Sequence, residues 1–255
     1  MKAFDKLRAR IREESFCPRW IGLISNPTYI LRRGLFRTIR ELSPYIQGRV
    51  LDFGCGSKPY EELFTGAQTY LGVDIAVSGH PHEDSKVDVF WDGRTLEFQD
   101  NHFDAVVSFE VFEHIFNLCE VLPEIRRVTK ESGYLLISIP FAWEEHETPY
   151  DFARYTSYGI SHILKSHGYD LVTIRKTTTY VLALWQILIA YLMRIIPRNR
   201  AIRYLCRVCI IFPCTLAAYA MDALLPRRYE YFCNTVVLAR KLAASSDDGA
   251  GEGGE

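Results

Sequence analysis

The sequence predicts an α/β fold in which a doubly wound, mostly parallel sheet carries helices on both faces. Segments with a strand pattern alternate with helical segments along most of the chain, as in repeated β-α-β units. The segment 134–139 is apolar except for Ser138, which is typical of a strand buried on both faces. With 48% hydrophobic residues among 255, the chain has enough apolar material for a large core.

Seven short segments are predicted as strands because they are apolar or alternating and end at turn residues. In chain order they are 49–53, 70–75, 86–90, 103–109, 134–139, 171–177 and 235–240. Helices are expected in 1–20, 29–40, 110–117, 122–129, 156–167 and 180–226. Thr156 has the residue type of a helix N-cap, and Gly168 is placed to end the same helix.

Composition divides the chain into four regions. Residues 1–44 are basic N-terminal helices, with ten bases against three acids in 1–40. Residues 45–179 together with 234–241 form the α/β domain, and 180–233 interrupt it as an apolar helical insert. Residues 242–255 hold small residues and acids but no base, so we expect a disordered acidic tail that contains Asp247, Asp248, Glu252 and Glu255.

The seven cysteines and the N-terminus indicate a cellular compartment. No apolar stretch follows the basic first twelve residues, as a secretory signal would require. We therefore expect reduced cysteines and a cytoplasmic protein. Cys206 and Cys209 have the CxxC spacing but no second ligand pair, and we interpret them as packed thiols. The net charge of −1 argues against a dedicated nucleic-acid-binding protein.

The strongest local signal is the turn Gly54-Cys55-Gly56, which directly follows the strand 49–53. Glycines at the end of a strand let a ligand approach the backbone closely, and the next helix offers free N–H groups. Asp74 ends the next strand about twenty residues later, a spacing that suits a carboxylate on ribose hydroxyls. A nicotinamide site would have a third glycine where this chain has Pro59. The pattern favours a nucleoside cofactor without a pyrophosphate.

The ordered series of motifs resembles the class I S-adenosylmethionine-dependent methyltransferases. Residues 50–56 are similar to the family's first motif, and residues 70–75 to its second. Residues 92–98 are similar to the acidic segment that contacts adenine. Residues 103–111 are similar to the fourth motif, and 122–140 to the helix and strand that follow it. The resemblance covers about 45–180 and the last strand. It implies a Rossmann-like fold, S-adenosylmethionine as the cofactor, and methyl transfer as the reaction.

The resemblance also implies which residues hold the methionine part of the cofactor. Gly54 and Gly56 would pass beneath it. Asp52 would orient its amino group, directly or through water. Each of these residues lies at or just after the end of the first strand of the α/β domain.

On the nucleoside side, the resemblance implies that Asp74 takes the ribose hydroxyls, next to Ile75 in the same motif. Asp92 would contact the adenine amine. Glu110, just past the fourth strand, would line the cofactor pocket.

The sequence Glu110-Val111-Phe112-Glu113-His114 brings two carboxylates and an imidazole together. On a helix, Glu110, Glu113 and His114 would share one face and could hold a divalent metal. Some O-methyltransferases that resemble this chain use a metal near the acceptor, and many others have Glu-His here without one. We expect no metal, and we keep metal-assisted O-methylation of a small aromatic or quinone-like acceptor as an alternative function.

The polar and aromatic segment 144–156 follows the fifth strand, at the sheet edge where open α/β folds bind ligands. It resembles a segment of a bacterial methyltransferase subfamily often encoded with surface-polysaccharide genes, which implies a glycan or lipid-linked acceptor. His146 is the candidate general base for a hydroxyl. Arg154 could hold an acidic sugar or phosphate, and Tyr150 could stack on a sugar. The alternative is a loop closed by its own ion pair between Asp151 and Arg154.

The helical insert is apolar but is interrupted by Gln186, Arg194, Arg203, Arg207, Pro213 and Asp222. Neither 180–196 nor 201–225 provides the roughly 20 uninterrupted apolar residues of a spanning helix. Seven bases against two acids in 180–230 favour a helical pair at an anionic membrane surface. Covering the sheet, or forming the face of a homodimer, are the other interpretations.

Together these patterns predict O-methylation of a glycan or lipid-linked glycan by a cytoplasmic enzyme, peripheral at the inner face of the membrane. No nucleic acid is expected as a partner. A cofactor-binding, membrane-associated protein without transfer activity is a third hypothesis, and release of S-adenosylhomocysteine would distinguish it from both enzymes.

Overall fold

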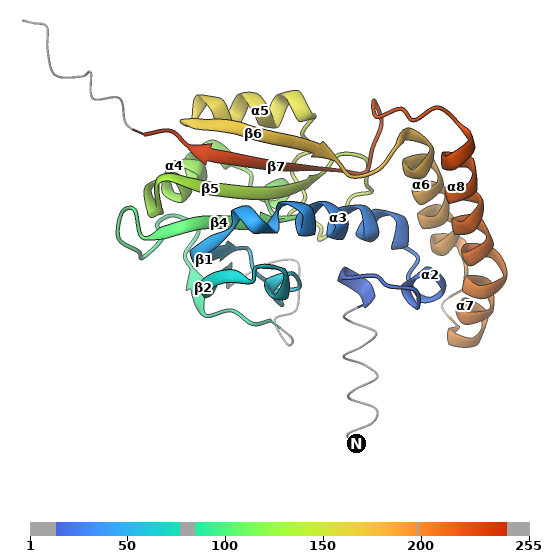
Figure 1. Cartoon of the computed structure of the whole chain (residues 1–255). Coiled ribbons are helices and arrows are strands. Elements are labelled where there is room, and N and C mark those ends of the chain that lie inside the picture. The colour runs from blue at the N-terminus through green and yellow to red at the C-terminus, as the bar shows by residue number, and fades with distance from the viewer. Residues whose placement is uncertain (1–13, 77–84, 198, 244–255) are drawn as a thin grey trace, which may run out of the picture.

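The computed structural model describes residues 14–76, 85–197 and 199–243, and its centre is a seven-stranded sheet (Figure 1). The strand order is β3-β2-β1-β4-β5-β7-β6. The strands are β1 Gln47–Phe53, β2 Gly66–Ile75, β3 Val89–Trp91, β4 Phe103–Phe109, β5 Thr129–Pro140, β6 Tyr169–Lys176 and β7 Asn234–Lys241. The first five strands pair in parallel, and β7 runs antiparallel to β5 and β6.

Helices pack on both faces of the sheet because the strands present apolar side chains to both sides. In β4, Val106 belongs to one buried cluster and Val107 to the other, as the alternation of a strand requires. α4 (Leu118–Val128) and α5 (Ser157–Ser166) cover the first face. α3 (Tyr29–Leu42) covers the second. The predicted doubly wound, mostly parallel fold is confirmed.

Shorter elements connect these layers. They are α2 (Gly22–Ser25) and the 3₁₀ turns η1 (Ser43–Tyr45), η2 (Glu61–Leu63) and η4 (Phe112–His114). The turn η4 replaces part of the helix that the sequence predicted at 110–117. Glu110 has a φ of +57°, outside the helical region, so the chain turns sharply as it leaves β4. Glu110, Glu113 and His114 therefore do not share one helix face, contrary to expectation.

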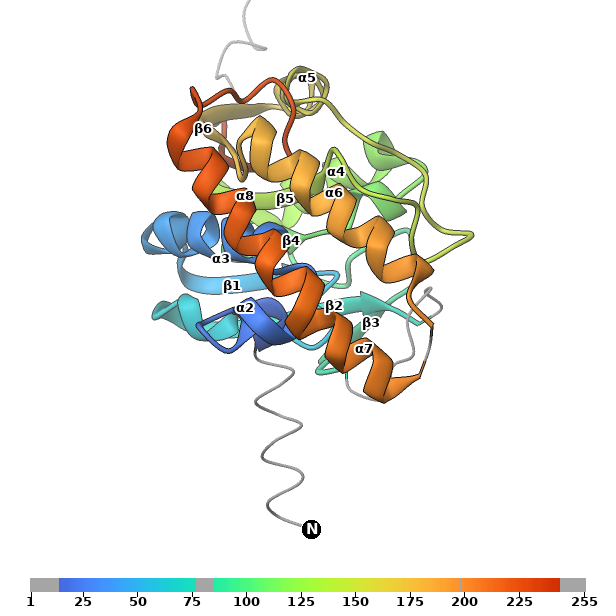
Figure 2. The same cartoon turned by 90° about the vertical axis from the view of Figure 1, so that its right-hand side faces the viewer.

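The helices between β6 and β7 form a layer beside the sheet (Figures 1 and 2). α6 (Tyr180–Ile195) packs along a second helical stretch that begins with α7 and ends with α8. That stretch consists of α7 Arg200–Cys206, the π-helical turn η5 Arg207–Ile211 and α8 Phe212–Leu224. The layer carries its own small apolar cluster, which also includes Ile30 at the start of α3.

Gln186, which the sequence analysis treated as an interruption of an apolar helix, joins this layer to the rest of the molecule. Its side chain is buried and accepts the backbone N–H of Leu31 at 3.1 Å. The same amide donates to the carbonyl oxygen of Pro27 at 3.0 Å. Leu31 lies in the first turn of α3 and Pro27 lies just before the helix, so one buried polar side chain fixes α6 against the start of α3.

Other differences from the sequence predictions concern element ends. β5 begins at Thr129, directly after α4, and β3 starts at Val89. Thr156 caps α5 as predicted, because its Oγ1 accepts the backbone N–H of Gly159 at 3.0 Å. Most of the predicted helix 1–20 and of the acidic tail lies outside the described residues.

All seven cysteines are free thiols. The two cysteines of the CxxC pair differ in burial. Cys206 is half-buried and Cys209 is exposed. The prediction of packed thiols is therefore wrong for Cys209, because η5 turns that residue towards the surface of the helical layer.

Candidate functional site

A cavity of about 730 Å³ lies at the carboxyl ends of β1, β2 and β4. β1 lies between β2 and β4, so the strand order reverses here, and open α/β sheets bind ligands at such points. The volume is within the roughly 300–1,000 Å³ typical of small-molecule sites. Six of the seven predicted cofactor residues line it: Asp52, Gly54, Gly56, Asp74, Ile75 and Glu110.

The turn after β1 requires its glycines. Gly54 and Gly56 have φ values of +75° and +47°, in the region that residues with a Cβ rarely adopt. A Cβ on Gly54 would lie 2.4 Å from the side chain of Val111. A Cβ on Gly56 would meet no described atom within 4 Å, so this glycine leaves its face of the turn open.

Asp74 holds the glycine turn in place from the end of β2. Its Oδ2 accepts the backbone N–H of Gly56 at 2.9 Å, and its Oδ1 accepts that of Ile75 at 2.8 Å. The carboxylate remains part of the cavity wall. Asp74 is thus available to a ligand and at the same time orders the turn on which that ligand would lie.

Asp52 is a buried carboxylate at the end of β1. Its Oδ2 accepts a hydrogen bond from the Tyr70 hydroxyl at 2.8 Å. Burial raises the pKa of Asp52 to about 7, although the Tyr70 hydrogen bond and the charge of Lys58 act in the opposite direction. An ammonium group of a ligand would favour the ionised form of this carboxylate.

This pKa predicts pH-dependent binding of a cofactor that carries an ammonium group. The ligand prefers ionised Asp52, so each pH unit below about 7 should weaken binding by up to tenfold. Affinity should rise from pH 5.5 to 7.5, and binding at pH 6 should release a proton. Calorimetry in buffers of different ionisation enthalpy measures both quantities.

Asp52→Asn should abolish this pH dependence, whereas replacement of the exposed Asp170 by asparagine should preserve it. An unchanged pH profile in Asp52→Asn would contradict the assignment of the effect to this carboxylate.

Asp92 is the predicted cofactor residue that does not line the cavity. Its Oδ1 accepts the backbone N–H groups of Arg94 at 2.8 Å and Thr95 at 3.0 Å, which closes the turn after β3. The preceding residue, Trp91, lines the cavity together with Ile75 and Val111. These three side chains offer an apolar surface for an aromatic base, and the contact between Asp92 and adenine stays a prediction.

Glu110 lies in the cavity wall and is held by two distant elements. Its Oε1 accepts from the Ser138 hydroxyl at 2.8 Å, and its Oε2 accepts from the Asn234 amide at 2.7 Å. Burial raises the pKa of Glu110, and the positive charge of Arg32 opposes that rise. Sequence reasoning missed both Asn234 and Arg32. The sequence offered one weak signal for each. Asn234 is an amide at the start of an apolar strand, and Arg32 is a basic residue on the helix before β1.

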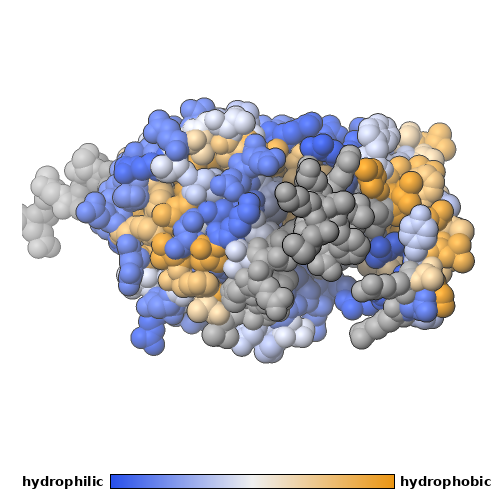
Figure 3. All heavy atoms as spheres, turned by 90° about the horizontal axis from the view of Figure 1, so that it is seen from below, coloured by the Kyte–Doolittle hydropathy of each residue, from blue (hydrophilic) through white to orange (hydrophobic). Residues whose placement is uncertain are grey.

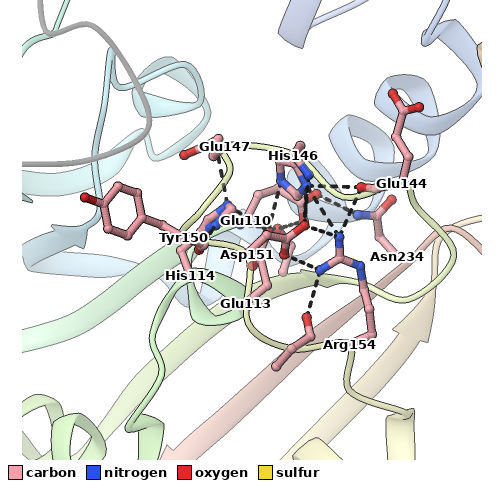
Figure 4. Close-up of polar contacts among 12 residues, drawn as sticks. Glu110, Glu113, His114, Glu144, His146, Glu147, Tyr150, Asp151, Arg154 and Asn234 are labelled. Carbon is pink, nitrogen blue, oxygen red and sulfur yellow. Dashed lines mark hydrogen bonds and ion pairs between the residues drawn. The ribbon is translucent and has the colours of Figure 1, made fainter.

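A second group of side chains meets the same cavity (Figure 4). His114 and His146 line it, and their rings meet edge to face with centroids 4.8 Å apart. Nε2 of His114 lies 3.7 Å from Oε1 of Glu113, and Nε2 of His146 lies 3.8 Å from the same oxygen. Burial raises the pKa of Glu113 well above its usual range, and the charge of Glu110 adds to the effect.

The segment between β5 and α5 is positioned by hydrogen bonds to η4. The carbonyl oxygen of Glu113 accepts the N–H groups of Phe152 at 2.8 Å and Ala153 at 3.2 Å. Nδ1 of His114 lies 2.7 Å from the carbonyl oxygen of Tyr150. These contacts bring the predicted acceptor segment beside the residues that follow β4, which the sequence could not show.

Arg154 and Asp151 form the ion pair that the sequence analysis gave as the alternative to acceptor binding. Both terminal nitrogens of Arg154 donate to the Asp151 carboxylate, one of them at 2.6 Å. Arg154 also donates to the carbonyl oxygens of Ala153 and Glu144. Burial would raise the pKa of Asp151, but the hydrogen bond from Arg154 and its charge lower it to about 2.

The three predicted catalytic residues therefore have different positions. His146 lies on the cavity wall, and Asp151 accepts its backbone N–H at 2.9 Å and lies 3.2 Å from its Nδ1. Both terminal nitrogens of Arg154 contact Asp151, and its role with an acceptor stays a prediction. Tyr150 is exposed, and its ring points away from the cluster (Figure 4). Arg32 is the one lysine or arginine among the residues that line the cavity.

The cavity fits S-adenosylmethionine, the cofactor that the motifs imply. Asp52 and Asp74 offer carboxylates for an ammonium group and for ribose hydroxyls. Gly56 leaves the open face over which a ligand can pass. The apolar wall that includes Trp91 suits the adenine ring.

Comparisons with known proteins agree with this site. A family model described as a methyltransferase domain matches residues 28–174, which is more than half of the chain. The match begins within the N-terminal region, so α3 belongs to it. A search of curated proteins finds no match.

Solved structures share the fold at low sequence identity. The [4+2]-cyclase SpnF is 17% identical with a TM-score of 0.51, over 81% of this chain and 82% of that one. An S-adenosylmethionine-dependent methyltransferase from Mesorhizobium loti is 13% identical with a TM-score of 0.50, over 83% and 100%. A proposed sarcosine dimethylglycine methyltransferase from Galdieria sulphuraria is 16% identical with a TM-score of 0.51, over 83% and 85%. Such likeness shows the fold alone.

Proposed function

Because the chain belongs to the methyltransferase-domain family, we propose that it transfers a methyl group to a hydroxyl oxygen of a glycan or lipid-linked glycan. The protein is an S-adenosylmethionine-dependent methyltransferase with a Rossmann-like fold. The cofactor supplies an electrophilic methyl group, and Asp52, Asp74 and the glycine turn would hold it. What we propose beyond the enzyme class is the acceptor, a glycan or lipid-linked glycan, and its hydroxyl group as the methylated site.

The observation that carries this proposal is the place of His146. Its imidazole lies on the wall of the cavity that the cofactor residues also line. In-line methyl transfer needs the acceptor oxygen to be positioned and its proton to be removed, and a placed imidazole serves both needs. Asp151 orients the ring from its Nδ1 side, and Arg154 holds Asp151. An oxygen acceptor therefore fits this wall.

Assays with defined acceptors test the proposal. Purified protein is incubated with S-adenosylmethionine and with a free saccharide, a lipid-linked saccharide or a catechol, and release of S-adenosylhomocysteine is measured. Acceptor-dependent release with either saccharide supports the proposal. Release with the catechol alone would contradict the glycan acceptor, while leaving the enzyme class intact.

The lipid-linked form of the acceptor is supported by the outer surface of the helical layer. Five residues of α6 that recur every three or four positions are exposed and apolar or aromatic: Tyr180, Leu184, Leu188, Tyr191 and Ile195. An 18-residue part of Ala201–Leu224 has a mean hydropathy of 1.6 and is only 17% buried. Contrary to the expectation from its interruptions, this helical stretch is long and apolar enough to cross a membrane, by length and composition alone. Apolar atoms gather at the right of Figure 3, the side of α7 and α8 in Figure 1.

A helical layer of this kind fits attachment to the cytoplasmic face of a membrane. An outward apolar surface this large is unusual for a protein that stays in water. Arg203 and Arg207, which interrupt the stretch, are half-buried, whereas Arg227 and Arg228 after it are exposed and can meet anionic headgroups. The proposed attachment would bring lipid-linked acceptors to the enzyme.

Leu188→Glu tests the membrane part of the proposal. The change puts a charge in the exposed apolar stripe of α6, so binding to vesicles with anionic lipid should fall at least tenfold. Tyr158→Glu is the matched control, since Tyr158 is 84% exposed on α5 and should leave binding unchanged. Co-sedimentation measures both, and equal binding by Leu188→Glu and the wild type would refute a membrane role for this stripe.

A further inference from the structure

The side chains of Glu113, His114 and His146 form a cluster at the acceptor end of the cavity. One atom each from Glu113, His114 and His146 lies within 4.8 Å of the other two. The two imidazoles meet Glu113 through Nε2, at 3.7 and 3.8 Å from its Oε1. Oε1 of Glu147 lies 3.6 Å from Nε2 of His114 and adds a second carboxylate at the edge of the group.

The other ring nitrogen of each histidine, Nδ1, faces acceptor oxygens, and Nδ1 of His146 also lies 3.5 Å from a terminal nitrogen of Arg154. Nδ1 of His114 faces the carbonyl oxygen of Tyr150 at 2.7 Å, which requires an N–H at Nδ1. Nδ1 of His146 faces the Asp151 carboxylate at 3.2 Å and the Glu144 carbonyl oxygen at 3.3 Å. With the N–H at Nδ1, Nε2 of each ring offers its lone pair to a cation. Metal-binding histidines characteristically have such an acceptor behind the ring.

Glu113 supplies an independent sign of a missing partner. Its side chain is 0% exposed, and neither carboxylate oxygen has a hydrogen-bond partner among the described residues. Nε2 of His114 is also buried without a hydrogen bond. An ionised carboxylate is rarely buried without a cation or hydrogen-bond donors. Within the described part of the chain, both carboxylate oxygens of Glu113 and Nε2 of His114 thus lack hydrogen-bond partners in the same place, and a bound cation would provide one.

We propose that Glu113, His114 and His146 bind a divalent transition-metal cation at the acceptor end of the cofactor cavity. Two imidazoles and one carboxylate suit Zn²⁺ or Mn²⁺. A tetrahedral site with metal–ligand bonds of about 2.1 Å has ligand atoms roughly 3.4 Å apart. The two distances to Glu113, 3.7 and 3.8 Å, need to shorten by a few tenths of an ångström, and the two imidazoles, whose ligand atoms lie within 4.8 Å, need to approach each other by up to about 1.4 Å. The set differs from the one considered from the sequence, since His146 replaces Glu110.

The proposed cation deepens the proposed function and rests on it for the identity of the acceptor. Three protein ligands leave a position for the acceptor hydroxyl, whose acidity the cation increases. The O–H proton passes to water, the oxygen forms a bond to the methyl carbon, and the sulfur keeps the electrons of the broken S–C bond. In this form of the mechanism the cation replaces His146 as the group that makes the hydroxyl lose its proton, and His146 serves the same acceptor oxygen as a metal ligand.

Metal binding can be measured without cofactor or acceptor, which keeps its outcome separate from that of methyl transfer. Untagged protein is treated with chelator, dialysed, and titrated calorimetrically with Zn²⁺ and, separately, with Mn²⁺. We expect one bound cation per chain for wild type and at least a hundredfold weaker binding for Glu113→Gln and His114→Gln. His162→Gln, in an exposed histidine of α5, is the control and should bind like wild type.

A second measurement uses only the wild type, so it tests the metal site even if the variants fail to fold. The Co²⁺-substituted protein should show the intense visible absorption of a four-coordinate site with nitrogen ligands. Absence of stoichiometric binding by folded wild type, or unchanged affinity in folded Glu113→Gln and His114→Gln, would overturn the proposal. Full methyl transfer by metal-free protein would overturn the role in activating the hydroxyl and leave the proposed O-methylation standing.

Discussion

Replacing His146 by alanine should lower kcat for methyl transfer about a thousandfold and leave the Kd for S-adenosylmethionine within twofold of wild type. Loss of an acid–base group typically costs about 10²- to 10⁴-fold in rate, and loss of a metal ligand acts on the same step. The imidazole belongs to the His114–Glu113 cluster rather than to the glycine turn, so cofactor binding should survive. Release of S-adenosylhomocysteine and calorimetric titration measure the two quantities.

His162→Ala is the matched control for this experiment, because it removes an exposed imidazole from α5. It should keep wild-type turnover. Activity of His146→Ala within threefold of wild type would show that the acceptor oxygen is activated elsewhere. A parallel loss of cofactor affinity would show instead that the variant disturbs the whole cavity.

Asp74→Ala should weaken the binding of S-adenosylmethionine at least a hundredfold. Two effects add in this variant. The cofactor would lose the carboxylate proposed to meet its ribose hydroxyls, and the N–H of Gly56 would lose its acceptor, which frees the turn. Asp74→Asn keeps an oxygen for the Gly56 N–H, so it should lose less affinity than Asp74→Ala.

Asp170→Ala removes an exposed carboxylate from β6 and serves as the control for charge alone. Its affinity should equal that of the wild type. Wild-type affinity in folded Asp74→Ala, confirmed as folded by circular dichroism, would contradict the ribose assignment and indicate that another group holds the nucleoside.

The cofactor half of the site was predictable because its geometry is local. The glycines follow β1 directly, and Asp74 ends the neighbouring parallel strand, so parallel pairing alone brings them together. A strand followed by two glycines has few conformations, and the observed positive φ values are the ones that glycine permits. These residues could be placed before any tertiary contact was known.

The acceptor half depends on contacts between distant segments, which sequence patterns do not encode. The carbonyl oxygen of Glu113 fixes Phe152 and Ala153, and this docking creates the group of His114 and His146. The helix predicted at 110–117 was wrong because Glu110 adopts a positive φ, and a hydrogen bond from Asn234 anchors its side chain. Arg154 is a recognisable binding residue by type alone, but its ion pair with Asp151 could only be given as an alternative before the structure was known.

The place of β7 in the sheet has a consequence for biosynthesis. β7 is the last of the seven strands along the chain, yet it lies between β5 and β6 and supplies the Asn234 amide that holds Glu110. A nascent chain that ends before residue 234 has every cofactor motif but leaves the edges of β5 and β6 unpaired. The sheet described here is therefore completed, and Glu110 anchored by Asn234, only once residues 234–241 have been translated.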